Sequence, residues 1–369
     1  MLAGRERALA TVDLGAIRHN VAHLVSLLPR GCHLCAVVKA NGYGHGAVPA
    51  ATAALAGGAG WLGVATATEA EELREAGLHV PILIFGPLTG AELERAVAAG
   101  ADVVAWSAPF VAQARKLAAR THVKHDSGMG RLGVDAATAV ALAAALGPAL
   151  QPVGLMTHFA TADEDEPAFF QGQLRRFLDL VADLKNTYAG LLAHCANSAA
   201  ILREPRAHCD MVRAGIAIYG LSPFHHDPSS DGLRPALRLT SYVAGVRVVQ
   251  AGDSVGYGRR FIAERESRIA IVPVGYGDGV ARALTNRGEV LVAGRRCAIV
   301  GTISMDQLTV LLPDGVGAPG DDVVFIGESG GERILAEDVA RLLQTINYEI
   351  VCDVGPRVVR RYVGAEPAA

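Results

Sequence analysis

Several features that mark particular classes of protein are scarce in this sequence. Six cysteines in 369 residues are too few for a disulfide-stapled scaffold, and no apolar run reaches the roughly 20 residues of a membrane span. The 34 basic and 37 acidic residues are mixed along the chain, so no cationic block follows a nucleic-acid backbone. The amino terminus carries charges where a signal peptide needs an apolar segment. We therefore expect a cytoplasmic protein that binds neither membranes nor nucleic acid.

Dinucleotide and metal motifs are also missing. No GxGxxG follows the first apolar run, which argues against a dehydrogenase. The pair Cys32 and Cys35 suggests half a zinc site or a redox pair, but no second CxxC or HxxxH accompanies it, and it leads into an apolar strand. We interpret both residues as ordinary buried thiols and expect no metal site.

What the sequence does contain is a repeated strand–helix pattern. Short apolar, β-branched runs alternate with Ala/Leu/Glu/Arg segments that have helical spacing. The eight runs begin near residues 34, 61, 81, 102, 121, 152, 190 and 211. This pattern predicts an α/β fold with an N-terminal (β/α)8 TIM-type barrel over residues 1–235.

The texture changes near residue 235. Alternating strands and Gly-rich turns follow, with one clear helical pattern, "LAEDVARLLQTI". We predict a C-terminal, mostly antiparallel β domain over residues 236–369. Whether residues 1–14 pair with this β domain rather than with the barrel is left open.

Polar residues close or enter the apolar runs of the predicted barrel. They are Lys39, Lys124, Asp126, His158, Asn197, Ser198 and Arg213. Any one of them could be polar only because the chain becomes exposed to solvent at the end of a strand. Because the carboxyl ends of parallel barrel strands meet at one mouth, the set as a whole predicts an active site there.

Lys39 and two residues near the last strands indicate the chemistry of that site. Burial lowers the pKa of a lysine, and an uncharged amine is a nucleophile. Ser198 and Gly215 lie where such barrels bind phosphate, one with a hydroxyl and the other without a Cβ in the way of an anion. A lysine beside a phosphate site predicts Schiff-base chemistry on pyridoxal phosphate.

The stretch "AVVKANGYGHG" at residues 36–46 resembles the pyridoxal-phosphate lysine motif of alanine racemases, and the likeness continues through both predicted domains. Further matches are "VKHDSGMGRLG" at 123, "GLMTHFATAD" at 154, "HCANSAA" at 194, "MVRAGIAIYG" at 211, "GDSVGYGRR" at 252, "VGYGDG" at 274, "ISMDQ" at 303 and "INYEI" at 346. The resemblance implies a homodimer with shared active sites that interconverts L- and D-alanine and supplies D-alanine for cell-wall peptidoglycan.

The resemblance also implies roles for individual residues. Lys39 would bind the cofactor and serve as one catalytic base, and Tyr257 of the other subunit would be the second. Arg213 would face the pyridine nitrogen with support from His158, and Arg131 would approach the phenolic oxygen. The cofactor would further contact Tyr43, Asn197, Ser198, Gly215, Ile216 and Tyr348. Substrate would contact Arg131, Met305 and Asp306, and Lys124 matches a lysine that is carbamylated in many members.

Arg213 bears on the alternatives that remain. A guanidinium can only donate to an unprotonated pyridine nitrogen, so the carbanion is less delocalised than it is with a carboxylate partner. This argues against a pyridoxal-dependent decarboxylase on the same plan. A broader-specificity racemase and a non-catalytic pyridoxal-phosphate carrier also remain. Thr302, where a basic residue is common in the family, and His125, where an apolar one is common, leave the charge of the site open.

Overall fold

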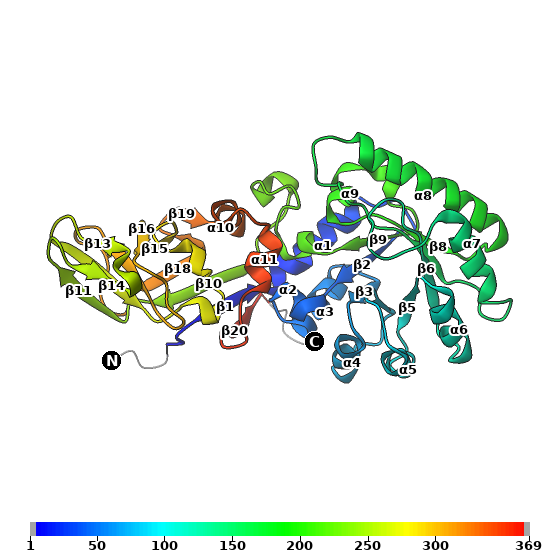
Figure 1. The fold of residues 1–369 in the computed structure, drawn as a ribbon, viewed down its shortest axis with the longest axis horizontal. Coiled ribbons are helices and arrows are strands. Elements are labelled where there is room, and N and C mark those ends of the chain that lie inside the picture. The colour runs from blue at the N-terminus through cyan, green and yellow to red at the C-terminus, as the bar shows by residue number, and fades with distance from the viewer. Residues whose placement is uncertain (1–4, 365–369) are drawn as a thin grey trace.

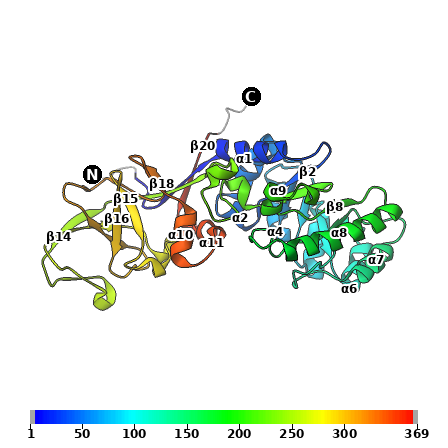
Figure 2. The same cartoon turned by 90° about the horizontal axis from the view of Figure 1, so that it is seen from above.

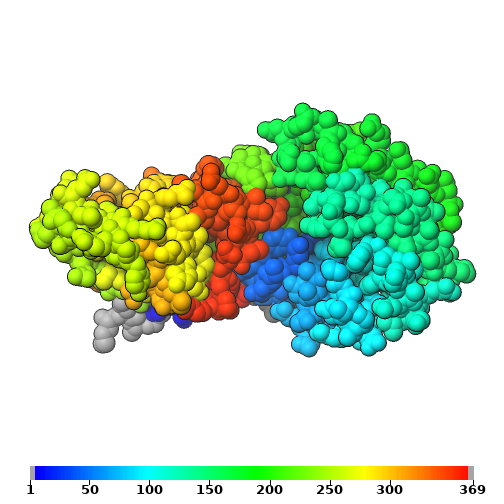
Figure 3. Space-filling model, viewed as in Figure 1, coloured from blue at the N-terminus to red at the C-terminus, as the bar shows by residue number. Residues whose placement is uncertain are grey.

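The computed structural model describes residues 5–364. The molecule is elongated, with a barrel at one end and a β-sheet domain at the other (Figures 1 and 2). In the space-filling view, the red C-terminal part of the chain fills the junction between the two (Figure 3). The predicted combination of a barrel and a mostly antiparallel β domain is confirmed.

The barrel is built from the eight predicted runs. Its strands are β2 (His33–Val37), β3 (Trp61–Val64), β4 (Ile82–Ile84), β5 (Asp102–Ala105), β6 (Thr121–Lys124), β7 (Gly154–Met156), β8 (Leu192–His194) and β9 (Met211–Ala214). All paired neighbours are parallel, in the order β8-β7-β6-β5-β4-β3-β2-β9. Two backbone hydrogen bonds bridge the ends of this order: the Arg213 amide donates to the Ala196 carbonyl (2.9 Å) and the Asp210 amide to the Ala193 carbonyl (3.0 Å).

Helices cover the outside of the barrel. They are α1 (Leu14–Ser26), α3 (Ala47–Ala56), α4 (Ala67–Glu75), α5 (Gly90–Ala98), α6 (Ala108–Lys116), α7 (Ala136–Ala145), α8 (Ala168–Thr187) and α9 (Ser198–Arg203). The short segment α2 (Lys39–Tyr43) is instead an irregular turn at the mouth of the barrel. Local sequence explains where several begin: Thr66 and Thr89 form capping boxes with Glu69 and Glu92. Apolar residues on their inner faces, such as Leu73, are fully buried.

The second domain is a sheet that is antiparallel except at one edge. Its strands are β1 (Leu9–Asp13), β10 (Leu237–Tyr242), β11 (Gly245–Val249), β14 (Ser267–Val272), β15 (Glu289–Val292), β16 (Arg295–Val300), β17 (Leu308–Leu312), β18 (Asp322–Ser329), β19 (Glu332–Ile334) and β20 (Val359–Val363). β12 (Ser254–Val255) and β13 (Phe261–Ile262) form a separate hairpin. β1 pairs antiparallel with β10 and parallel with β20.

The amino-terminal segment therefore joins the second sheet. Residues 9–13 lie between β10 and β20, whereas residues 1–4 of the segment 1–14 lie outside the described residues. β10 begins at Leu237, close to the predicted boundary at residue 235. The division into two folding units at that residue stays a prediction.

Two short helices connect the sheet to the barrel: α10 (Ala336–Leu343) and α11 (Asn347–Cys352). The side chain of the buried Asn347 donates through Nδ2 to the Ser222 carbonyl (2.8 Å) and to Glu337 Oε1 (2.9 Å). The backbone amide of Ser222 also donates to Glu337 Oε1 (3.1 Å). These bonds hold α11 against the barrel, so Tyr348 and Cys352 reach its mouth.

Both cysteines of the CxxC are free thiols, as expected, but only Cys35 is buried and the prediction of burial is wrong for Cys32. Cys35 is buried within the barrel interior beside Trp61, and Cys32 is partly exposed with its Sγ 3.5 Å from the His208 carbonyl. Burial raises the pKa of each thiol to about 12, which keeps both protonated and unreactive at neutral pH.

Candidate active site

A cavity of about 560 Å³ opens at the carboxyl end of the barrel strands. Of the site residues that the sequence placed on the barrel, all but Asp126 line it, together with one from α11. These are Lys39, Tyr43, Lys124, Arg131, His158, Asn197, Ser198, Arg213, Gly215, Ile216 and Tyr348. Residues that are up to about 300 positions apart in the sequence therefore share one space, as parallel barrel topology requires.

A left-handed turn follows Lys39 at the end of β2. Ala40, Asn41, Gly42 and Tyr43 all have positive φ, between 50° and 61°. Such a conformation costs about 1–2 kcal/mol for each residue with a Cβ, so surrounding contacts must hold it. The Ala40 amide donates to Glu69 Oε1 (2.7 Å), and Asn41 Oδ1 accepts from the Ala47 amide (3.0 Å). The turn directs both Lys39 and Tyr43 into the cavity.

The cavity is strongly cationic. Burial and then Arg131 lower the pKa of Lys39, and burial followed by Arg213 and Arg131 lowers the pKa of Lys124 to about 8. Asp126, just after the end of β6, makes no ion pair with Lys124. Its carboxylate instead accepts hydrogen bonds from the amides of residues 128–130, at 2.7 to 3.2 Å. The excess of positive charge suits an anionic ligand such as a phosphate ester.

Arg213 is held more firmly than any other cation in this cavity. Its side chain is buried, and Nη1 donates to the His194 carbonyl (2.8 Å) and to His194 Nδ1 (2.9 Å). Nη2 donates to the carbonyls of Thr157 (2.7 Å) and Cys195 (3.1 Å), with His158 Nδ1 at 3.4 Å. Among the described residues none accepts a hydrogen bond from Nε, which leaves that N–H as the donor for a ligand.

His158 is placed beside Arg213 as predicted. Burial, followed by Arg213 and Lys124, lowers the pKa of its imidazole well below the ordinary range. The neutral ring accepts from the guanidinium rather than repelling it. It therefore supports the arginine without adding to the positive charge of the cavity.

The far end of the cavity has small and polar groups. Ser198 Oγ accepts from the amides of Gly215 (3.0 Å) and Ala217 (3.3 Å), and Asn197 caps α9 by accepting from the Ala200 amide (3.0 Å). A Cβ at Gly215 would lie 2.7 Å from the Tyr43 hydroxyl, so a larger residue here would displace the tyrosine side chain. Burial raises the pKa of Tyr43 and Tyr348, which keeps both phenols protonated as donors.

The remaining predicted residues lie elsewhere in the chain. Tyr257, Met305 and Asp306 line a cavity of about 550 Å³ in the β domain. The Tyr257 side chain is exposed, at 74%, and Met305 is also exposed. None of the described residues accepts from the Met305 amide, while Asp306 accepts from Arg357 Nη1 (2.9 Å). A single chain does not bring these residues to Lys39.

Both unusual positions now have a structural context. Thr302 Oγ1 donates to the Tyr257 carbonyl (2.6 Å), so this residue supports the backbone of the tyrosine. His125 is buried with Nδ1 2.9 Å from the Val134 carbonyl, and it does not line the barrel cavity. Neither residue adds a charge next to Lys39.

Sequence reasoning missed His194, which lies behind Arg213. It is the last residue of β8 and is fully buried. His194 closes an apolar run, which is the signal that could have identified it, but Asn197 and Ser198 follow within four residues and carry the same signal. Phe85 and Cys352 also line the cavity without having been predicted.

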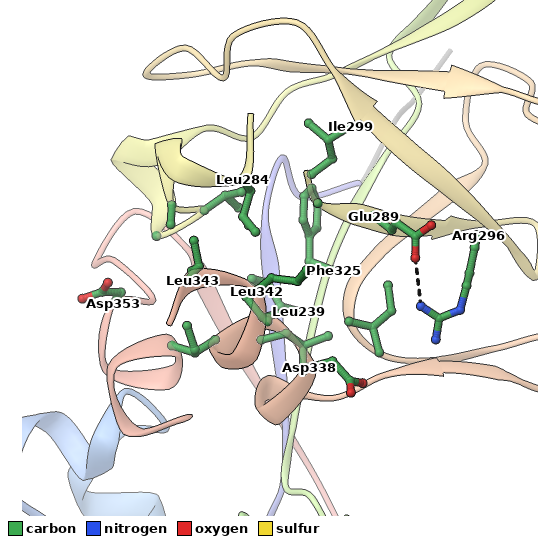
Figure 4. Close-up of a pocket in the computed structure, with 18 residues that line it drawn as sticks. Leu239, Leu284, Glu289, Arg296, Ile299, Phe325, Asp338, Leu342, Leu343 and Asp353 are labelled. Carbon is green, nitrogen blue, oxygen red and sulfur yellow. Dashed lines mark hydrogen bonds and ion pairs between the residues drawn. The ribbon is translucent and has the colours of Figure 1, made fainter. Parts of the chain in front are cut away.

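Another cavity lies in the β domain between α10 and the sheet (Figure 4). It has a volume of about 70 Å³ and is lined largely by apolar side chains such as Leu284, Leu343 and Phe325. An ion pair between Glu289 and Arg296 (3.1 Å) lies among its lining residues (Figure 4). The cavity offers no cluster of reactive groups, so the barrel mouth remains the candidate active site.

Fold and site together define a barrel enzyme with a lysine-bearing, anion-binding cavity and an appended β domain. Two family models match the chain: "Alanine racemase, N-terminal domain" over residues 12–223 and "Alanine racemase, C-terminal domain" over residues 236–362. The chain belongs to the alanine racemase family, whose members are isomerases.

Individual relatives agree with this assignment. The alanine racemase of Symbiobacterium thermophilum is 43% identical over 98% of this chain and 99% of its own length. The solved alanine racemase of Streptomyces coelicolor A3(2) is 39% identical with a TM-score of 0.92, and 99% of each chain is covered. The Bacillus anthracis alanine racemase, solved with bound L-Ala-P, is 38% identical with a TM-score of 0.90, covering 98% of this chain and 96% of that one.

Over residues 5–364, no helix combines the length and apolar character needed to cross a bilayer.

Proposed function

We propose that this protein racemises alanine with pyridoxal phosphate bound in the barrel cavity. The observation that carries the proposal is the pairing of Lys39, whose pKa is lowered, with Arg213, whose terminal N–H groups are already satisfied by the protein. A neutral amine is needed to bind an aldehyde, and a fixed guanidinium limits how far the ring withdraws electrons.

The residues of the cavity fit this cofactor. The phosphate would be held by Tyr43, Ser198, Gly215, Ile216 and Tyr348, where a Cβ at position 215 would close the space. Arg213 Nε–H would donate to the pyridine nitrogen, and Arg131 would approach the phenolic oxygen. When bound, the cofactor supplies the electron sink that acidifies the proton on the substrate Cα.

Two bases would move that proton. The Lys39 amine would take or return it on one face, and the Tyr257 hydroxyl would do so on the other. Because Tyr257 lies in the β domain away from Lys39, we assign it to the site of a second copy. The proposal is therefore a homodimer in which each active site combines the barrel of one subunit with the β domain of its partner.

The substrate carboxylate has two candidate donors. The Met305 amide has no acceptor among the described residues, and Arg131 lines the barrel cavity. Asp306 would hold the loop in place through its ion pair with Arg357. Lys124, with a pKa of about 8, has a sizeable neutral fraction that can react with carbon dioxide, and the resulting carbamate would offset the charge of Arg131.

The proposal includes a biological setting. The six cysteines of the chain all lie within the described residues and are free thiols, which supports a reducing, cytoplasmic location. There the protein would supply D-alanine for cell-wall peptidoglycan. Arg213, rather than an acidic residue, at the predicted position of the pyridine nitrogen argues against the decarboxylase alternative.

Incubation with L-alanine in deuterated water tests the proposal. D-Alanine and deuterium at Cα would be followed by chiral chromatography and NMR, with L-serine and L-lysine as competing substrates. D-Alanine as the dominant labelled product is expected, with the other two amino acids far behind. Cofactor binding without any D-enantiomer would overturn the two-base assignment and favour the carrier or decarboxylase.

A further inference from the structure

Arg213 is the first member of a hydrogen-bonded chain that crosses the barrel interior. Its Nη1 lies 2.9 Å from His194 Nδ1, and His194 Nε2 lies 2.8 Å from His122 Nδ1. His122 Nε2 lies 3.1 Å from Asp102 Oδ2. These side chains come from four different strands, β9, β8, β6 and β5, so the chain is a feature of the barrel rather than of one segment.

The direction of every bond in this chain is fixed by its first member. A guanidinium can only donate, so His194 Nδ1 must accept and its one proton must lie on Nε2. That N–H donates to His122 Nδ1, which places the proton of His122 on Nε2, facing Asp102. Each imidazole therefore has a single tautomer. Burial followed by Arg213 lowers the pKa of His194 well below its ordinary range, which agrees with a neutral ring.

The chain ends on a charge at the opposite end of the barrel. Asp102 is the first residue of β5, whereas His194 is the last residue of β8, near the cavity. Asp102 Oδ1 also accepts from Arg120 Nε (2.7 Å), whose side chain is exposed. Buried hydrogen bonds that connect two charges of opposite sign are mutually polarised and strengthened. The Asp102 carboxylate thereby favours the arrangement in which each member of the chain donates toward it.

The barrel is shaped to admit this chain. His122 and His194 are fully buried, and their rings meet edge to face with centroids 5.0 Å apart. A Cβ at Gly154, on the neighbouring β7, would lie 2.2 Å from His122 Nδ1. Any other residue at position 154 would displace the ring, so the glycine there leaves the space that His122 occupies.

We propose that His194, His122 and Asp102 are positioning residues that hold Arg213 as a fixed hydrogen-bond donor toward the pyridine nitrogen of the cofactor. The inference rests on the proposed function, and it explains how a ring nitrogen without a carboxylate partner is kept unprotonated. When the chain is broken, Arg213 can turn away and the nitrogen gains a proton more readily. A deeper electron sink then favours transamination, in which alanine and pyridoxal phosphate become pyruvate and pyridoxamine phosphate.

The tautomers can be tested without turnover. Full-length protein with ¹⁵N-labelled histidine would be examined by long-range ¹H–¹⁵N NMR before and after pyridoxal phosphate is added. We expect His122 and His194 each to carry a proton on Nε2, as the directions of the hydrogen bonds require. A proton on Nδ1 of His194 would overturn the proposal.

Variants then test the consequence for the cofactor. His122→Phe keeps an aromatic ring but cannot accept from His194, and Asp102→Asn keeps an acceptor but removes the charge. His208→Phe is the matched control, since within residues 5–364 the side chain of this buried histidine bonds only to the Ile201 carbonyl (3.0 Å). The readouts are cofactor affinity by fluorescence and the ratio of pyruvate to D-alanine. A rise of one unit in the pKa of the ring nitrogen would raise that ratio by about tenfold.

We expect the largest rise for His122→Phe, a smaller one for Asp102→Asn and none for His208→Phe. If His122→Phe does not fold, Asp102→Asn and the wild-type spectra still decide. A folded His122→Phe protein with normal affinity and a normal ratio would contradict the proposal. If the protein does not racemise at all, the spectra and the cofactor affinity still test the chain, so the two failures are distinguishable.

Discussion

The two groups of predicted site residues differ in how much of their environment one chain provides. Arg213 is 4% exposed and makes hydrogen bonds to five carbonyl or ring acceptors within its own barrel. Tyr257 is 74% exposed, and none of the described residues bonds to its hydroxyl. The barrel group is therefore preorganised inside one subunit, whereas the β-domain group needs a second surface. This difference supports an active site assembled from two copies.

Lys39→Ala should produce the largest effect, because it removes both the proposed attachment point of the cofactor and one of the two proposed bases. We expect racemisation to fall on the order of 10⁴-fold or more. The visible absorption of protein-bound cofactor should be lost as well. Retained D-alanine formation would show that the barrel group is not the centre of the chemistry.

Tyr257→Phe should remove one base while leaving the barrel group intact. Racemisation is expected to fall by about 10²–10⁴-fold with unchanged cofactor affinity, measured by chiral chromatography and by fluorescence titration. Tyr242→Phe, on the partly buried strand β10, is the matched control and should remain active. Equal activity in both variants would remove Tyr257 from the mechanism.

Lys124→Met tests whether the barrel group contains a buried amine whose pKa is lowered. Burial lowers the pKa of Lys124 to about 8 in the folded protein, so the unfolded chain binds more protons between that pH and the ordinary lysine value of 10.5. Stability should therefore rise with pH across this window, by at most about 1.4 kcal/mol per pH unit. Urea unfolding in buffers free of carbon dioxide, which keep Lys124 as an amine, should show this rise reduced in the variant, and an unchanged slope would contradict a buried, unpaired amine.

Thr302→Val should have the smallest effect. It removes the hydrogen bond to the Tyr257 carbonyl, a loss of about 1 kcal/mol, and should lower kcat a few-fold by loosening the tyrosine. Thr52→Val removes a similar bond, to the Val48 carbonyl on a helix surface, and is the control. If Thr302→Val loses stability but keeps the kcat of Thr52→Val, Thr302 does not position Tyr257.

Much of the barrel group was predictable, because the periodicity of short apolar runs marks strands and parallel strands share one mouth. That logic placed Lys39, Lys124 and Arg213 together. It could not predict the four consecutive positive φ angles at residues 40–43, which run against local preference and depend on Glu69 and the Asn41 side chain. It also could not reveal the hydrogen-bonded chain from Arg213 to Asp102, which depends on side-chain geometry across four strands.

The β-domain group was less predictable from pattern alone. Tyr257, Met305 and Asp306 lie in Gly-rich turns, where a turn residue and a site residue look alike. Only the resemblance to a family singled them out. Tyr257 and Met305 are exposed in a single chain, and in the proposed dimer the contacts that define their role would come from the other subunit.

Mixing two inactive variants tests the shared site most directly. Lys39→Ala and Tyr257→Phe subunits would be unfolded together, refolded with cofactor and assayed for D-alanine. Each mixed dimer would hold one site with both bases intact and one with neither, so a statistical mixture should regain about a quarter of wild-type specific activity. No gain over the separate variants, with mixed dimers present by mass spectrometry, would contradict an active site built from two subunits.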